Sequence, residues 1–248
     1  MSTLRLSIVT ITYNASATLE RTIRSVEKQD YDNIEYIIVD GASTDGTLDI
    51  VKSHSAHVSQ YISEPDNGLY YAMNKGLALA TGDYIWFVNA GDEIATPTTV
   101  SQMMTLAQNA DVLYGDTVMT NSDGEEIGTR RLTPPQKLTW KSFKRGMLVS
   151  HQSFIARRSI CPYYDTQYRF SADIDWCIKI LKQSNNIVNT QLTLSRFLDG
   201  GITKQNIVAG LKERFKIMTI HYGLFSTILN HIPITLKFFY FWITKGRF

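Results

Sequence analysis

Residues 1–90 alternate between apolar runs and amphipathic patterns, and this order restricts the fold more than any other feature of the chain. The runs have the β-branched and aromatic composition of buried strands, at Leu6 to Thr12, Ile34 to Val39, Gln60 to Ser63 and Asp83 to Val88. Helical spacing of apolar residues separates them, at Ala17 to Gln29, Thr47 to Ser53 and Leu69 to Ala80. This alternation predicts an α/β domain with a mostly parallel, doubly wound central sheet.

The rest of the chain continues this order less regularly. We predict strands at Asp111 to Asp116, Ser150 to Ala156 and Ile187 to Arg196, and a hairpin from Val118 to Arg131. Predicted helices cover Pro97 to Asn109, Ser171 to Lys182, Lys204 to His221 and Leu224 to Phe248, the last interrupted near Pro233. The chain therefore divides into an α/β domain, residues 1–200, and a helical tail, residues 201–248.

The tail differs from the domain in charge. It holds seven Lys or Arg and one Asp or Glu, a net charge of +6, which leaves −4 for residues 1–200 of a chain whose total is +2. Aromatic residues alternate with these cations, and Ile232 to Ile243 is apolar but too short to span a bilayer. We expect this amphipathic tail to contact a membrane surface. The alternative is a helix packed on the core or on a partner subunit.

The compartment is suggested by what the sequence lacks. Cys161 and Cys177 form neither a disulfide framework nor a metal-binding pattern, which fits a reducing compartment. The N-terminus has no signal-peptide pattern, and no segment has the run of about 18 apolar residues typical of a membrane span. We expect a cytoplasmic protein, peripheral on the inner face of the cell membrane.

Acidic residues follow three of the predicted strands: Asp40, Asp92 and Asp116. One such residue alone is usually a turn former or a helix cap. Three on the carboxyl edge of one sheet would repel each other, so a cation or a ligand is expected among them. Both common glycine-rich phosphate loops are absent, because Tyr13 to Ser16 contains no glycine and no G-x-x-x-x-G-K-[ST] occurs.

Five segments then occur in order: Thr10 to Asn14, Ile38 to Gly46, Ser63 to Gly68, Ala72 to Gly76 and Thr81 to Asp92. Together they resemble the family 2 glycosyltransferases of the GT-A fold, over roughly residues 5–200. The resemblance implies a Rossmann-like, mostly parallel central sheet with flanking helices. It also implies a hexosyl- or N-acetylhexosaminyltransferase similar to bacterial enzymes of surface-polysaccharide assembly, with residues 1–200 as the nucleotide-sugar-binding and catalytic domain.

The resemblance also implies a nucleotide-sugar donor site. Asp40 matches the family's aspartate that recognises the base, usually uracil, and Thr12 and Tyr13 match the loop around that base. The matching positions near the ribose and diphosphate are Asp66, Gly68 and Asn74. Two alternatives stay open, since Gly68 can serve only the start of a helix and Asn74 can be an exposed helix residue.

The family's metal motif is matched by Asn89-Ala90-Gly91-Asp92, in which Asp92 is the only carboxylate. The resemblance implies that Asp92 holds Mg²⁺ or Mn²⁺ together with the donor phosphates. Asn89 is a possible contact of the donor or acceptor. So are His151 and Gln152, which are predicted to begin a strand near the site. A single histidine is more often structural.

The family's catalytic base is matched by Asp173, in the segment Ala172 to Trp176. Asp175, a possible acceptor contact, is two residues further on and points elsewhere in a helix. The alternative is that Ser171 or Asp173 only caps this helix. One carboxylate beside the acceptor is sufficient for a single displacement with inversion.

The leading hypothesis is an inverting, metal-dependent glycosyltransferase. It would move a sugar from a nucleotide-sugar, expected to be a UDP-sugar, to a glycan or a lipid-linked saccharide. The alternatives are a sugar nucleotidyltransferase, which would carry a glycine- and basic-rich loop near Tyr13, and a non-catalytic sugar-binding domain. No nucleic-acid partner is expected.

Overall fold

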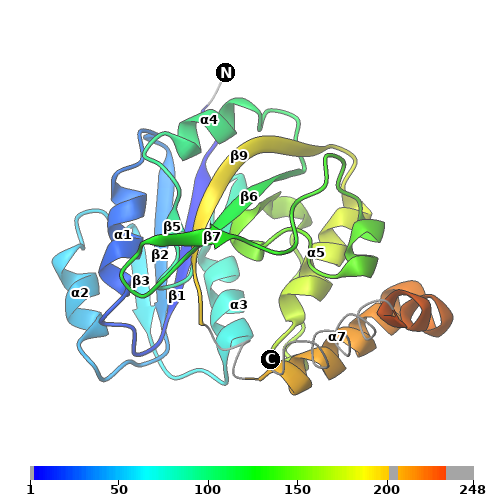
Figure 1. The fold of residues 1–248 in the computed structure, drawn as a ribbon. Helices are drawn as coiled ribbons and strands as arrows, with labels where there is room; N and C mark the ends of the chain where they lie inside the picture. The colour runs from blue at the N-terminus through cyan, green and yellow to red at the C-terminus, as the bar shows by residue number, and fades with distance from the viewer. Residues whose placement is uncertain (1–2, 201–205, 233–248) are drawn as a thin grey trace.

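A computed structural model describes residues 3–200 and 206–232, and Figure 1 shows one α/β body built on a single sheet. The sheet of the described residues has nine strands in the order β3-β2-β1-β4-β8-β6-β9-β5, with β7 paired to β6. Their bounds are β1 Leu6–Thr12, β2 Ile34–Asp40, β3 Gln60–Ser63, β4 Tyr84–Phe87, β5 Glu93–Ile94, β6 Val112–Thr120, β7 Glu126–Thr129, β8 Phe154–Arg157 and β9 Ile187–Leu198.

Helices lie on both faces of the sheet (Figure 1). The α-helices are α1 Leu19–Glu27, α2 Thr47–Ser53, α3 Leu69–Leu79, α4 Thr99–Thr105, α5 Ala172–Gln183 and α7 Ile207–Tyr222. Short 3₁₀ helices are η1 Trp140–Arg145, η2 His151–Ser153 and η3 Arg158–Ile160. A further helical segment covers residues 224–232.

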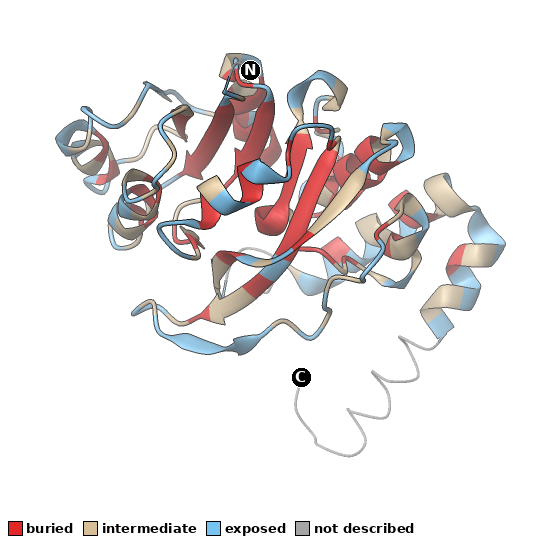
Figure 2. Ribbon diagram, turned by 90° about the horizontal axis from the view of Figure 1, so that it is seen from above, coloured by how far each residue is buried: buried red, intermediate tan, exposed pale blue. Residues whose placement is uncertain are grey.

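The strands are buried because alternate side chains fill two separate cores. Val9 and Phe87 point into one core with α3 and α5. Ile8 and Trp86 point into the other with α1, α2 and α4. Figure 2 shows the central strands as almost continuously buried. Each fully buried side chain of this size contributes roughly 1.5–3 kcal/mol, which explains why near-continuous apolar runs predict these strands correctly.

The predicted α/β fold is confirmed. Strands β3, β2, β1 and β4 are parallel neighbours, and β6 and β9 form a further parallel pair. Two predicted strand bounds are wrong. His151 and Gln152 do not begin a strand, because the Ser153 amide donates to the Ser150 carbonyl and closes a 3₁₀ turn before β8. A strand does not end at Asp116, because β9 pairs along β6 as far as Thr120.

Strand β9 positions the site by reaching across the molecule. It arches over the body in Figure 1, and its last residues pair with β5, where Glu93 faces Arg196. This pairing brings Leu198 onto the turn at Gly91, whose φ is +99°. A side chain at Gly91 would put its Cβ 2.7 Å from the Leu198 side chain, so only glycine fits.

Helix α7 packs against α5, so the first part of the tail belongs to the same body. The carboxylate of Glu213 accepts hydrogen bonds of 2.8 Å from the amides of Arg169 and Phe170, just before α5. Further along, His221 Nε2 lies 2.6 Å from Asp175 Oδ1. The predicted interruption near Pro233 and the rest of the predicted last helix, residues 233–248, lie outside the described residues.

Candidate active site

The end of β2 holds Asp40, which is 1% exposed. Its carboxylate accepts hydrogen bonds from the Ser43 amide at 2.9 Å, the Ser43 hydroxyl at 2.5 Å and the Ser63 hydroxyl at 2.7 Å. A carboxylate has about four lone-pair positions, so one acceptor position remains. Asp40 is therefore rigidly oriented and can still accept one N–H from a ligand.

The loops around Asp40 meet closely over Gly41. A Cβ at Gly41 would lie 3.0 Å from Asp66 Oδ2 and 3.2 Å from the Tyr13 ring. Tyr13 is 66% exposed, so its ring is accessible for stacking. The Thr12 hydroxyl oxygen is buried and has no hydrogen-bond partner in the structure, which is unusual for such a group. Thr12 faces Asp40 in the pairing of β1 with β2, and these two residues with Tyr13 and Asp66 are called the Asp40 group below.

Gly68 and Asn74 have contacts that explain them without a nucleotide. Gly68 has φ +127° at the start of α3, and its amide donates to Asp66 Oδ1 at 2.8 Å. The Asn74 amide group donates to the Tyr164 carbonyl at 2.9 Å and accepts from the Tyr164 amide at 2.7 Å. Asn74 is therefore not the exposed helix residue of the alternative interpretation, and its predicted nucleotide contact has no support in this geometry.

Asp92 is deeply buried, at 4% exposure. Its Oδ1 accepts a hydrogen bond from the Leu198 amide at 3.1 Å, and its Oδ2 accepts one from Gln152 Nε2 at 3.0 Å. Burial raises the pKa of Asp92 to about 7, although these two hydrogen bonds and Arg21 oppose the shift. Gln152 thus supports Asp92 rather than facing an open cleft, and a cation or a further donor would make Asp92 ionise more readily.

The residues at this turn fit a divalent cation. The Asn89 side-chain oxygen is buried and has no hydrogen-bond partner in the structure. An unpartnered amide oxygen and a buried carboxylate three residues later are oxygen ligands of the kind that Mg²⁺ and Mn²⁺ take. Within residues 3–200 and 206–232, no group of three His, Cys, Asp or Glu residues is arranged to hold a metal ion.

Asp173 lies in the first turn of α5 and connects to Asn89 through His151. His151 Nδ1 lies 3.7 Å from Asp173 Oδ2, and its Nε2 lies 3.2 Å from Asn89 Nδ2. The Tyr70 hydroxyl donates to Asp173 Oδ1 at 3.2 Å. Burial lowers the pKa of His151; Asp173 opposes this shift and Arg130 adds to it, and the net lowering keeps the ring neutral at pH 7. The side chain of Asp173 is 15% exposed, so one face of it remains accessible.

Two predicted site residues lie elsewhere. Asp175 is buried in ion pairs with Lys179 and His221, both at 2.6 Å, and does not face the site. Burial would raise the pKa of Asp175, but the hydrogen bonds from His221 and Lys179 outweigh it and hold that pKa below its usual range. These contacts give no support to the suggested acceptor or donor contact of Asp175. Asp116 is an exposed residue in the middle of β6 rather than an acidic strand end.

Sequence reasoning missed several residues of this site. Tyr70 and Asp173 are separated by 103 positions, and Ser63 and Asp40 by 23, so no local pattern joins them. Asn14 is one residue that a signal could have found, since it follows the strand and tolerates the φ of +46° that it adopts. Its side-chain oxygen accepts a hydrogen bond from the Thr44 amide at 2.9 Å, which joins the loop after β1 to the loop after β2.

The sequence from residue 7 to residue 162 matches the model of the glycosyl transferase family 2. The chain belongs to this family. The family resemblance and the glycosyltransferase class expected from the sequence are thereby confirmed. Family membership places the buried turn at Asp92 and the accessible carboxylate of Asp173 in an enzyme that transfers sugars.

The chain is also similar in sequence to proteins that are named as glycosyltransferases. An uncharacterised glycosyltransferase of Mycobacterium tuberculosis is 31% identical over 182 residues, which cover 70% of this chain and 67% of the relative. A PGL/p-HBAD biosynthesis glycosyltransferase of Mycobacterium bovis is 31% identical over 186 residues, covering 70% of this chain and 68% of the relative.

Solved structures share the GT-A fold. Staphylococcus aureus TarS 1-349 in complex with UDP has a TM-score of 0.68 at 19% identity, covering 88% of this chain and 65% of that one. The mannosyltransferase PcManGT from Pyrobaculum calidifontis, in complex with GDP-Man and Mn²⁺, has a TM-score of 0.62 at 14% identity, covering 95% of this chain and 76% of that one. The chain thus spans about two thirds of the TarS fragment.

Proposed function

We propose that this glycosyltransferase is an inverting, metal-dependent enzyme that uses a UDP-sugar and glycosylates a glycan or lipid-linked saccharide. The observation that supports this most is the position of Asp173. Its contacts are Tyr70 at the start of α3 and His151, which in turn contacts Asn89 just after β4. The proposed base thus lies at the carboxyl edge of the sheet, where β1 and β2 also end at Thr12 and Asp40.

In the donor site, Asp40 accepts the imide N–H of uracil with its remaining lone pair, and Tyr13 stacks on the base. The buried hydroxyl of Thr12 gains a partner in the bound nucleotide. Asp66 belongs to the Asp40 group, with its Oδ2 close to Gly41, and is proposed to contact the ribose. Gly68 supports this arrangement by fixing Asp66.

In the transfer step, Asp173 accepts the proton of the acceptor hydroxyl. The acceptor oxygen forms a bond to the anomeric carbon from the face opposite the diphosphate, and the bond from that carbon to the diphosphate oxygen breaks, so the configuration inverts. Tyr70 holds one oxygen of Asp173, and neutral His151 directs its Nδ1–H toward the other. Both residues orient the carboxylate without protonating it.

The cation is proposed to be Mg²⁺ or Mn²⁺, held by Asp92 with Asn89. When bound, it would supply positive charge to the diphosphate leaving group. Ionisation of Asp92 is unfavourable in its buried position. We therefore expect the metal to bind weakly alone and tightly together with the nucleotide.

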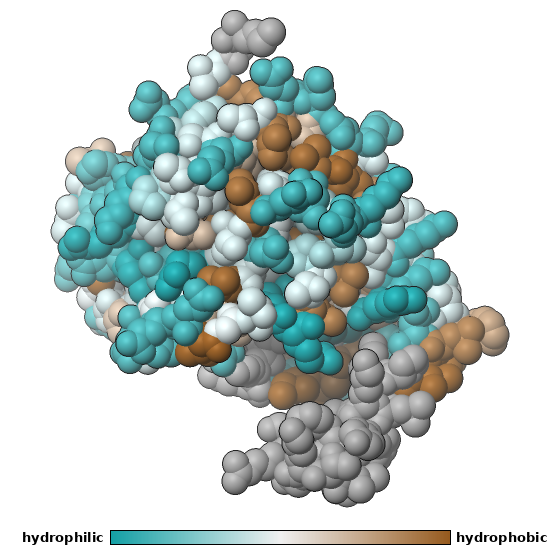
Figure 3. All heavy atoms as spheres, turned by 45° about the horizontal axis from the view of Figure 1, so that its top comes forward, coloured by the Kyte–Doolittle hydropathy of each residue, from teal (hydrophilic) through white to brown (hydrophobic). Residues whose placement is uncertain are grey.

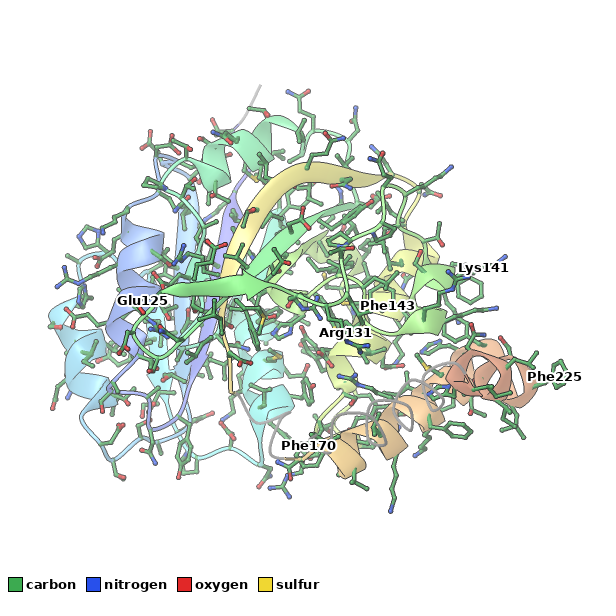
Figure 4. All side chains as sticks on the ribbon, viewed as in Figure 1. Glu125, Arg131, Lys141, Phe143, Phe170 and Phe225 are labelled. Carbon is green, nitrogen blue, oxygen red and sulfur yellow. The ribbon has the colours of Figure 1, made fainter. Side chains whose placement is uncertain are left out.

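We also propose that the tail lies on the inner face of the cell membrane. No helix in the part of the chain that the structure describes is long and apolar enough to cross a bilayer. Helix α7 and residues 224–232 nevertheless expose large apolar side chains, among them Leu211, Phe215, Leu224, Phe225, Leu229 and Ile232. They form a brown region at the lower right of Figure 3, and Figure 4 shows Phe225 pointing away from the body. Exposed Lys212 and Lys216 add positive charge beside them.

The membrane proposal is tested by deleting residues 224–248. We expect the shortened chain to bind vesicles that contain anionic lipid more weakly than the full chain does. Equal binding of the two chains would reject a membrane contact through this segment.

The catalytic proposal is tested with the purified full chain, Mn²⁺ and a panel of nucleotide-sugars. One UDP-sugar should raise the melting temperature only when metal is present, and it should be hydrolysed or transferred. Asp173→Asn should lower kcat by about 10²–10⁴-fold and leave the Kd for the donor unchanged. The matched control is Asp116→Asn, an exposed carboxylate whose loss should change neither. Full turnover by Asp173→Asn would remove this residue as the base.

A further inference from the structure

A stacked pair of aromatic rings joins η1 to the end of α7. The rings of Trp140 and Tyr222 are nearly parallel, at an angle of 7°, and their centres are 5.4 Å apart. The Tyr222 hydroxyl donates a hydrogen bond of 2.5 Å to the Trp140 carbonyl and so fixes the pair. Both residues are only half-buried. The pair therefore forms part of the molecular surface where η1 and α7 meet.

Three lysines lie over these two rings. Lys182 Nζ is 4.9 Å and Lys141 Nζ is 5.7 Å from the centre of the Trp140 ring. Lys144 Nζ is 5.4 Å from the centre of the Tyr222 ring. A cation at such a distance is attracted to the ring face, but the ring carries no net charge and leaves the charge of the lysine uncompensated. The two rings and the three lysines are called the Trp140 cluster below.

No carboxylate forms an ion pair with these three lysines within residues 3–200 and 206–232. Lys182 Nζ donates to His221 Nδ1 at 2.9 Å, which is a ring nitrogen and not a carboxylate. The sequence around η1 adds charge, since residues 130–145 hold six Lys or Arg and no Asp or Glu. The Trp140 cluster thus lies in a positive region of a domain, residues 1–200, whose net charge is −4.

Exposed apolar side chains adjoin the cluster. Tyr222 is the last residue of α7, and the exposed Leu224 and Phe225 follow it directly after Gly223. Figure 4 shows Lys141 and Phe225 on the same side of the molecule, at the right of the view. A soluble polyanion would match the lysines but would leave the apolar side chains in water. An anionic bilayer matches both, because its charged headgroups lie directly above its acyl chains.

We propose that the Trp140 cluster binds the anionic headgroups of a lipid bilayer, so that the membrane contact includes η1 and α5 of the catalytic domain as well as the tail. Lipid phosphates supply the negative charge that the three lysines lack within the protein. The two aromatic rings lie at the level of the headgroups, where amphipathic rings are favoured. That the cluster faces the bilayer together with the tail rests on the proposed function, whereas headgroup binding depends on the cluster alone.

The test is the binding of the full chain to vesicles of phosphatidylglycerol and phosphatidylcholine in equal parts, measured by co-sedimentation at low salt. Each cation near an anionic surface contributes roughly five-fold to binding. Removal of all three should therefore weaken binding about 100-fold. The variant is Lys141→Gln/Lys144→Gln/Lys182→Gln. Wild-type binding should also fall as NaCl is added, and binding of this variant should depend less on salt.

The matched control loses the same charge from the α1 and α2 side of the molecule, which lies away from α7 in Figure 1. It is the exposed triple Arg24→Gln/Lys28→Gln/Lys52→Gln, which should bind these vesicles within a few-fold of the wild type. A second variant separates charge from folding. Lys141→Arg/Lys144→Arg/Lys182→Arg keeps all three charges and should bind like the wild type, and a loss of binding by it would overturn the proposal.

The remaining outcomes distinguish the cluster from the proposed function. Equal binding by the glutamine variant and the wild type would overturn the role of the cluster, even if deletion of residues 224–248 abolishes binding. Loss of binding by the glutamine variant alone would support the cluster and reject the tail contact. Equally tight wild-type binding to pure phosphatidylcholine vesicles, or binding to none, would overturn headgroup recognition. The shift in melting temperature with UDP and Mn²⁺ tests the donor site separately and should be the same in every variant.

Discussion

The burial of Asp92 predicts an unusual dependence of stability on pH. Its pKa is about 7 in the folded chain, against an ordinary value of 3.8. Because the folded state holds this proton more tightly than the unfolded state, the penalty is absent below pH 3.8 and complete above pH 7. The difference in pKa corresponds to about 4 kcal/mol at high pH. Between pH 5 and pH 8 the metal-free protein should lose about 2–3 kcal/mol of unfolding free energy through this group.

The perturbation that isolates this effect is Asp92→Asn, which removes the ionisation and keeps an oxygen for the Leu198 amide. Urea unfolding of both proteins in chelator-containing buffer gives the unfolding free energy of each at pH 5 and at pH 8, and so its change between the two pH values. The variant should gain about 2–3 kcal/mol of unfolding free energy relative to the wild type between the two pH values. A relative gain below about 0.5 kcal/mol would refute the reasoning, because it would mean that Asp92 ionises in the fold as it does in water. Addition of UDP and Mn²⁺ at pH 8 should stabilise the wild type more than the variant.

Two further predictions concern the Asp40 group and the tail. Gly41→Ala should raise the Kd for UDP about ten-fold with little change in the unfolding free energy, because the new Cβ would lie 3.0 Å from Asp66 Oδ2. An unchanged Kd by calorimetry would mean that uracil binds elsewhere. His221→Ala should lower the unfolding free energy by about 1.5–3 kcal/mol, because it removes a partner of buried Asp175. The exposed His57→Ala is its control in urea unfolding, and equal stability of the two variants would contradict this role.

The sequence alone predicted those parts of the fold that depend on local patterns of residues. The first four strands and their helices were predicted because buried parallel strands are apolar throughout. This pattern can be recognised without knowing which strands pair with each other. The same reasoning found Asp40, since an aspartate that ends an apolar run is visible in the sequence. Asp92 was found in the same way, because it follows the fourth predicted strand. The family motifs added Asp173, and the roles of all three residues remain proposals.

The rest depends on contacts between distant residues. Nothing near Asp92 indicates that Leu198, 106 positions away, would cover it. Asn74 was predicted as a nucleotide contact, with an exposed helix residue as the alternative, because its partner Tyr164 is 90 positions away and no local pattern shows it. Asp116 looked like a strand end because an exposed polar residue inside a paired strand cannot be distinguished locally from a terminus.

The contacts between α5 and α7 have a geometric consequence. Glu213 accepts hydrogen bonds from the segment before α5, and His221 contacts Asp175 within α5, so the two helices are joined at two points. A bilayer that fixes the outer side of α7 would then also fix the height of Asp173 above the lipid headgroups. The enzyme would then select acceptor hydroxyls by their distance from the membrane as well as by their chemistry.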